Sequence, residues 1–229
     1  MTDRRITDSI SCSEVYEVLS KSLEVNPEDY TVLVALAVGG GSPFSVLVGA
    51  VLSQNTSDKN SIRALKSLAE RVGLSPEKIL EAGLSEVEEA IKTAGLWKSK
   101  ARAIVELARL VLSRGGEEYL LREDPLVLRE ELLRVRGVGP KTVDVFLSVA
   151  RRAPVFPVDT HAARVALRWG LASSRRYSEV SRALLECFGA ERSEEAHRLV
   201  IALGRAYCRA RRPRCKECPL RAHCPSSEA

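Results

Sequence analysis

Residues 133–161 constrain the fold more than any other part of this 229-residue chain. They contain LRVRGVGPKTVDVFL and, shortly afterwards, FPVDTH. Gly137 and Gly139 flank one apolar residue, and glycine adopts positive φ without a steric penalty, so this pattern predicts a tight turn. Pro140 suits the first position of a helix, where its missing N–H would have had no partner. The stretch therefore predicts two helices joined by a short hairpin.

A hairpin of this kind is a natural binding site for an anion. Its backbone N–H groups lie at the positive end of the dipole of the following helix. Arg134, Arg136 and Lys141 add full positive charges beside it. Phosphate is the expected ligand, although a plain glycine turn between two helices explains the two glycines equally well on this pattern alone.

Composition and charge narrow the class of protein. The sequence has no apolar run of membrane-spanning length and no signal-peptide pattern at its start, so we expect a soluble intracellular protein. The net charge is +5, and residues 205–224 alone hold seven basic residues and one acidic residue. A basic patch on a nearly neutral body indicates a polyanionic partner.

Apolar residues recur at helical spacing along most of the chain, and no alternating pattern typical of strands persists. We therefore predict an all-α fold. The segment from Phe44 to Ser53 is apolar nearly all round, which predicts a helix in the centre of the core. A further helix is expected from about Lys98 to Ser113.

The six cysteines fall into two groups. Four follow the spacing C-x6-C-x2-C-x5-C at the C-terminal end, and such a set of thiolates binds either a structural zinc ion or a [4Fe–4S] cluster. The spacing by itself favours neither the zinc ion nor the [4Fe–4S] cluster. These candidate ligands are Cys208, Cys215, Cys218 and Cys224. Cys12 and Cys187 lie apart from them and are expected to be buried, unpaired thiols.

Taken together, these motifs resemble a known family. LRVRGVGPKTVDVFL followed by PVDTH is similar to the endonuclease III-like DNA glycosylase/AP lyases of the helix-hairpin-helix (HhH-GPD) superfamily, and the similarity runs from Ser42 to Cys224. The resemblance implies that Lys141 and Asp159 form the catalytic pair. It also implies a two-domain helical fold, with residues 42–152 in one domain, residues 1–41 and 153–229 in the other, and the active cleft between them.

The two proposed catalytic residues make chemical sense. Lys141 would lie in the first turn of its helix, where the dipole and the nearby arginines disfavour the ammonium form and prepare the amine to attack a sugar C1′. Asp159 could stabilise the cationic sugar or transfer protons. The simpler alternatives are that Lys141 only holds a phosphate and that Asp159 only caps the helix beginning near Thr160.

Further residues are expected to contact DNA. The resemblance implies phosphate contacts by the hairpin and by the loop between the first two cysteines, and entry of polar and apolar side chains into the base stack. These candidates are Gly137, Gly139, Arg136, Gln54, Asn55, Leu96, His161, Arg211 and Arg212.

Two of these assignments leave alternatives. The LSxQxTD segment of the family aligns with residues 52–58, where Asn55 takes the place of the intercalating Gln and Gln54 lies one residue earlier, so either could fill the gap left by a flipped base. GLWKSKA is similar to the wedge loop of the family, with Leu96 as the wedge and Lys98 and Lys100 near phosphates. Leu96 and Trp97 could instead be core residues.

The expected function follows from these assignments. The cysteine spacing matches the [4Fe–4S] motif of the family at every position, which implies a structural cluster. We expect a monomeric enzyme that removes oxidised pyrimidines from double-stranded DNA and nicks abasic sites. The alternatives are a glycosylase for mismatched uracil or thymine or for alkylated bases on the same scaffold, and a helix-hairpin-helix DNA-binding module without catalysis.

Overall fold

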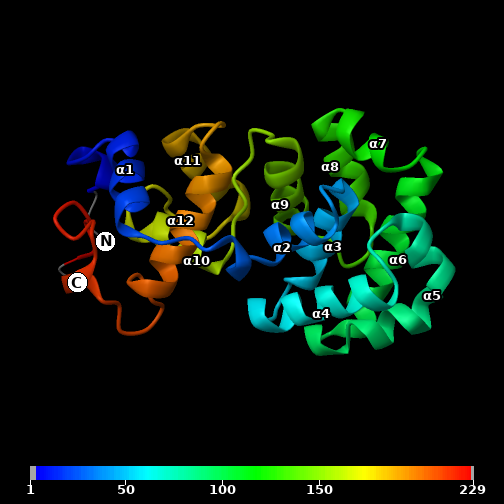
Figure 1. Ribbon diagram of the computed structural model, residues 1–229. Helices are drawn as coiled ribbons and strands as arrows, with labels where there is room; N and C mark the ends of the chain where they lie inside the picture. Colours follow the sequence, from blue (N-terminus) through cyan, green and yellow to red (C-terminus); the bar gives the residue numbers. More distant parts are fainter. Residues whose placement is uncertain (1–3, 228–229) are drawn as a thin grey trace. The chain divides into compact units, whose positions relative to one another are not determined.

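The computed structural model of the chain describes residues 4–227. This range consists of helices joined by turns and contains no β-strand, which confirms the all-α prediction. None of the helices in this range has the length and apolar character needed to cross a membrane. The contacts divide the chain into two compact units, and the helices of both are labelled in Figure 1. Unit 1 comprises the described residues of Met1–Val25 and Arg152–Ala229, and unit 2 is Asn26–Arg151.

Unit 2 is built from helices that follow one another along the chain. They are α2 (Thr31–Val38), α3 (Pro43–Leu52), α4 (Asp58–Arg71), α5 (Pro76–Ala90), α6 (Trp97–Ser113), α7 (Glu117–Arg122), α8 (Pro125–Arg134) and α9 (Pro140–Arg151), with the 3₁₀ segments η2 (Pro27–Asp29) and η3 (Lys92–Ala94). Four of these helices begin at a proline, whose fixed φ and missing N–H suit the first helical position. The start of α9 at Pro140 is as predicted.

Helix α3 forms the centre of unit 2. Every residue from Phe44 to Leu52 is buried, which confirms the central helix predicted from its apolar sequence. Helices α2, α4, α6 and α9 contact it, and Figure 1 shows α3 beside α2 within this unit. At Gly49 the neighbouring helix α2 comes so close that an added Cβ would lie 2.7 Å from the Cβ of Ala35. Only glycine permits this approach.

The contacts of α2 show that the boundary between the units lies earlier in the chain than the sequence suggests. Residues 26–41 were expected in the same domain as the N-terminus, but they belong to unit 2. Besides its contact with α3, helix α2 is joined to α4 because Thr31 Oγ1 lies 2.6 Å from Ser61 Oγ and donates to Asp58 Oδ1 at 3.2 Å. The boundary in this part of the chain therefore lies after Val25, not after residue 41.

Unit 1 combines both ends of the chain around a core of its own. Its helices are α1 (Cys12–Ser22), α10 (Thr160–Arg168), α11 (Tyr177–Phe188) and α12 (Ser193–Ala206), with the 3₁₀ segments η1 (Ile6–Asp8) and η4 (Cys215–Glu217). The rings of Phe156 and Phe188 stack with their centroids 6.1 Å apart in this core. Trp169, almost fully buried, packs beside Phe188.

The two isolated cysteines are joined in a disulfide bond. Cys12 opens α1 and Cys187 lies in the last turn of α11, with their Cα atoms 5.2 Å apart. The prediction of unpaired thiols was wrong, and both residues are only partly buried. A sequence separation of 175 residues hides the pairing, because the packing of α1 on α11 alone brings the two positions together.

Candidate functional site

The predicted hairpin connects α8, which ends at Arg134, to α9, which begins at Pro140. Gly137 has φ of +90°, so this glycine is required by the backbone. Gly139 does not lie in the positive-φ region, contrary to the prediction that both glycines are needed for the turn. An added Cβ at Gly139 would meet no atom within 4 Å, so this position leaves open space for a ligand to approach the backbone.

A partly buried ion pair joins the two helices of the hairpin. Arg129 Nε of α8 donates to Asp144 Oδ1 of α9 at 2.8 Å, and the Asp144 side chain is 4% exposed. Neither residue was identified from the sequence. The available signal was a carboxylate on the apolar face of VDVFL, because a charge there is stable only when it is paired.

The end of α3 meets this hairpin at two points. Lys141 Nζ lies 3.4 Å from Ser53 Oγ, directly after α3. Gln54 Nε2 donates to the carbonyl oxygen of Gly137 at 3.0 Å and to Thr142 Oγ1 at 2.9 Å. Residues far apart in sequence are thus brought together around the first turn of α9. Gln54 is thus bound to the hairpin by hydrogen bonds, and this role differs from the one expected for its neighbour Asn55.

Two residues near this position combine an exposed side chain with an unusual backbone conformation. Asn55 has φ of +48° and Leu96 has φ of +49°, in the left-handed region that non-glycine residues seldom adopt. Asn55 is exposed, and Leu96 is 62% exposed despite its apolar side chain. Leu96 is therefore not a core residue, whereas Trp97 is partly buried. Such strained, exposed positions are typical of functional sites.

Lys100 is almost fully buried, so the expectation that it lies near a phosphate is wrong. Its side chain is 3% exposed, and its Nζ donates to the carbonyl oxygens of Leu52 at 2.8 Å and Ala94 at 2.7 Å. Burial lowers the pKa of Lys100 to about 8. Lys100 thereby ties the end of α3 to η3, the segments that lead to Asn55 and Leu96. Its neighbour Lys98 is exposed.

In unit 1, Asp159 and His161 lie at the start of α10. Asp159 Oδ1 accepts the Ala162 N–H at 2.7 Å, which confirms that Asp159 caps this helix. The ring of His161 is partly buried, and its Nδ1 lies 3.0 Å from Arg164 Nη2. A guanidinium can only donate, so Nδ1 is an acceptor. Burial lowers the pKa of His161, which favours the neutral ring.

The four C-terminal cysteines follow α12 and are all free and partly buried. Burial raises the pKa of Cys218 and Cys224, and the charges of the neighbouring thiols raise both further. Arg168 Nη1 donates to Cys208 Sγ at 3.2 Å and to the Arg209 carbonyl at 2.8 Å, which holds the start of the loop. Among residues 4–227, no group of three His, Cys, Asp or Glu side chains is arranged to hold a metal ion.

The donor chemistry of this cysteine set fits a cationic centre. Cys208 and Cys215 lie close enough to Cys218 and Cys224 to raise the pKa of both, and four partly buried thiolates at this position would repel each other. A group that supplies positive charge would remove this repulsion. Arg211 and Arg212 are exposed in the loop between the first two cysteines, and Arg212 has φ of +50°.

The buried Lys100 leads to a prediction about pH. Its pKa in the folded chain, about 8, lies below that of an unfolded lysine, so between these values the unfolded state binds more protons. The free energy of unfolding of the wild type, relative to Lys100→Met, should rise by up to about 3 kcal/mol from pH 7.5 to 10.5. Urea unfolding at several pH values measures this difference.

Lys98→Met is the matched control, since its side chain is exposed two residues away. Its stability difference from wild type should stay flat across the same range. A flat profile for Lys100→Met as well would show that Lys100 is not buried in the folded protein.

Comparison with known proteins agrees with this geometry. The model of the HhH-GPD superfamily of base excision DNA repair proteins matches residues 48–189. Endonuclease III of Sulfolobus acidocaldarius is 37% identical over 183 residues, which cover 79% of this chain and 81% of that protein. Endonuclease III of Escherichia coli K12 is 34% identical over 212 residues, 93% of this chain and 95% of that protein.

A solved structure of a trapped endonuclease III–DNA covalent intermediate matches with a TM-score of 0.72 and 27% identity, covering 96% of this chain and 98% of that chain. The agreement thus extends from the hairpin motif to nearly the whole fold. The chain belongs to the HhH-GPD superfamily of base excision DNA repair proteins and is a DNA glycosylase with AP lyase activity of the endonuclease III type.

Proposed function

We propose that this enzyme excises oxidised pyrimidines from duplex DNA and that Lys141 is its nucleophile. The observation that carries the proposal is the setting of Lys141, in the first turn of α9 and beside the hairpin that is suited to phosphate. Ser53 Oγ, 3.4 Å from Nζ, fixes the direction of the amine. A related endonuclease III forms a covalent intermediate with DNA, as an amine nucleophile requires.

The reaction divides into two stages. The Lys141 amine attacks C1′ of the flipped nucleotide, the bond from C1′ to the base breaks, and the base leaves with that electron pair and takes up a proton. Loss of a proton from Nζ and opening of the sugar ring give a Schiff base. Removal of a C2′ proton then expels the 3′ phosphate by β-elimination, and water releases the lysine. Flipping is least costly for a base that is already poorly stacked.

Asp159 is proposed to stabilise the positive charge that develops on the sugar. Its Oδ1 is engaged by the Ala162 N–H, while Oδ2 has no hydrogen bond among the described residues. The helix cap thus orients the carboxylate and leaves one oxygen for the reaction. A carboxylate that is acceptor-only is suited to an oxocarbenium-like state.

Lys141→Ala should abolish the adduct that borohydride traps between the protein and abasic DNA, while DNA binding is largely retained, because the nucleophile is removed. Asp159→Asn preserves the cap, since asparagine caps helices as well as aspartate does. It should slow trapping by roughly 10²-fold or more, the usual effect of removing one electrostatic or proton-transfer group. Single-turnover trapping and gel-shift binding measure the two properties.

The same assay tests the base class. Wild-type protein should form the adduct faster on duplexes that contain an oxidised pyrimidine than on duplexes with mismatched uracil or an alkylated base. Trapping of Lys141→Ala at the wild-type rate would assign the nucleophile to another amine, and fastest trapping on a different base would overturn the oxidised-pyrimidine assignment.

The remaining candidate residues are proposed to divide between phosphate binding and the base stack. The amides of Gly137 and Gly139, with Arg136 in the hairpin and Arg211 and Arg212 in the cysteine loop, would contact phosphates, which position the duplex without reading its sequence. His161 would contact the strand near Asp159. Asn55 and Leu96 would enter the space of the flipped nucleotide, because both are exposed on left-handed backbone. Gln54 would instead support the hairpin through its bonds to Gly137 and Thr142.

This division predicts different losses in two activities. Asn55→Ala and Leu96→Ala should lower base excision from duplex DNA more than they lower nicking at a preformed abasic site, where no base remains to be extruded. Gln54→Ala, the matched comparison next to Asn55, should lower both activities alike because it loosens the hairpin. Parallel excision and nicking assays decide the matter, and equal losses in all three variants would contradict the assignment of Asn55 and Leu96.

We also propose that Cys208, Cys215, Cys218 and Cys224 hold a [4Fe–4S] cluster. The set contains only thiols, which suits iron–sulfur chemistry, and its spacing is that of the family motif. Such a cluster supplies positively charged iron to four thiolates, and its role here would be structural. The basic loop from Arg209 to Arg214 would be held by the cysteines at both of its ends.

Purified protein should therefore be yellow-brown and contain iron and sulfide in equal amounts, about four of each per chain. Cys215→Ser should lower both contents together, while the Cys12→Ser/Cys187→Ser protein should retain them. One zinc ion per chain without iron would refute the cluster.

A further inference from the structure

A groove of about 910 Å³ lies along α6 and α8 in unit 2 and reaches the hairpin. It extends from the first turn of α6 at Ser99 to the end of that helix and includes Val135 of the hairpin. Its walls are rich in arginine. The arginines are Arg102, Arg109, Arg114, Arg134 and Arg136.

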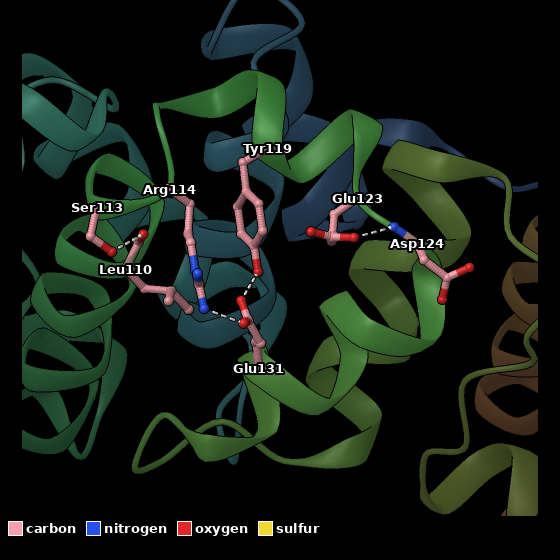
Figure 2. Close-up of polar contacts among 7 residues, drawn as sticks. All are labelled: Leu110, Ser113, Arg114, Tyr119, Glu123, Asp124 and Glu131. Carbon is pink, nitrogen blue, oxygen red and sulfur yellow. Dashed lines mark hydrogen bonds and ion pairs between the residues drawn. The ribbon is translucent and has the colours of Figure 1, made fainter.

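The end of the groove far from the hairpin is electrostatically neutralised. Figure 2 shows that Glu131 accepts hydrogen bonds from both the Arg114 guanidinium and the Tyr119 hydroxyl. Burial, together with the Glu131 carboxylate, raises the pKa of Tyr119, so this hydroxyl remains a donor. Arg109 Nη1 in turn contacts Glu106 Oε1 at 2.5 Å. The two arginines of this end therefore have carboxylate partners.

The arginines at the end of the groove next to the hairpin are not neutralised in this way. Arg102, Arg134 and Arg136 are exposed, and none of them forms a hydrogen bond or ion pair within residues 4–227. Glu106 and Glu131 are the carboxylates that line the groove, and both already have partners there. Three guanidinium groups without carboxylate partners repel one another unless an anion lies among them. Such an arrangement favours an anionic ligand from outside the chain.

The chemistry of the walls identifies the ligand. No aromatic side chain lines the groove, so it has no platform on which bases could stack. Guanidinium groups match the geometry of phosphate oxygens. The groove is also continuous with the hairpin, because an added Cβ at Gly137 would lie 3.5 Å from Ala103 Cβ and 3.8 Å from Ser99 Oγ, both in the first turns of α6.

We infer that the hairpin end of this groove binds the sugar–phosphate backbone of DNA, beyond the phosphates held by the hairpin itself. The inference rests on the proposed function, since it extends the same duplex away from the hairpin. Arg102 of α6 and Arg134 of α8 are the residues that make the extension. Arg109 and Arg114 take no part, because their charges are matched within the groove.

The experiment compares single charge removals within one groove. Arg102→Gln, Arg134→Gln and Arg109→Gln each remove one positive charge, and all three positions are exposed. Equilibrium binding is measured by fluorescence anisotropy against KCl concentration, with a duplex that carries a tetrahydrofuran abasic analogue. Arg102→Gln and Arg134→Gln should each reduce the log–log salt slope by up to about 0.9 and should weaken binding to undamaged duplex in parallel. Arg109→Gln should keep the wild-type slope.

Two outcomes would overturn the inference: wild-type slopes in both Arg102→Gln and Arg134→Gln, or an equal reduction in Arg109→Gln, which would indicate a general effect of net charge. Thermal unfolding confirms that the variants are folded. Borohydride trapping at saturating protein reports on Lys141 independently and should remain at the wild-type level in the control variant Arg109→Gln. Its absence in the wild type would count against the proposed function, whereas the salt slopes alone decide on the groove.

Discussion

The burial of α3 on every side is the constraint on which unit 2 depends. A helix without a polar face has no stable place at a surface, and each of its large apolar side chains gains roughly 1.5–3 kcal/mol from burial. The surrounding helices must therefore enclose it, and Gly49 allows α2 to approach closely. The chain leaves this core at Ser53 and Gln54, so the packing that stabilises the unit also fixes where Lys141 and the hairpin find their partners.

Because α3 is enclosed, its last carbonyl groups are buried without helical partners, and Lys100 supplies a hydrogen bond to one of them. The last carbonyl groups of a helix lack intrahelical partners, and the carbonyl of Leu52 lies at the buried end of α3. Lys100 donates to it and also to Ala94, at the cost of burying an amine. The lowered pKa, about 8, reflects this cost, which falls at higher pH because the neutral amine still has two N–H groups to donate. The left-handed residues Asn55 and Leu96 follow the two segments that Lys100 joins, which explains how their strain is maintained.

Features that depend on neighbouring residues were predictable, and features that depend on distant packing were not. The hairpin, the start of α9 at Pro140, the central helix and the cap by Asp159 all follow from local rules. The disulfide bond of Cys12 with Cys187, the Arg129–Asp144 pair and the burial of Lys100 each require knowledge of which helices meet. The proposal that Lys141 and Asp159 act as a pair rests on family resemblance, since no periodicity connects a helix start with a helix cap eighteen residues later.

The distribution of charge over the surface was also not predictable from the sequence. The sequence suggested that the basic character gathers in residues 205–224, because elsewhere acidic residues balance the basic ones in number. Numerical balance does not imply local neutralisation. Arg71 pairs with Glu86 and Arg122 with Glu118, while three arginines at the hairpin end of the groove have no such partner among the residues that the structure describes. A polyanion interacts with this local excess of positive charge and not with the net charge of the chain. Salt screening limits the range of each charge to about 10 Å at moderate ionic strength. Unit 2 thus carries a local positive patch, at Arg102, Arg134 and Arg136, that the net charge does not reveal.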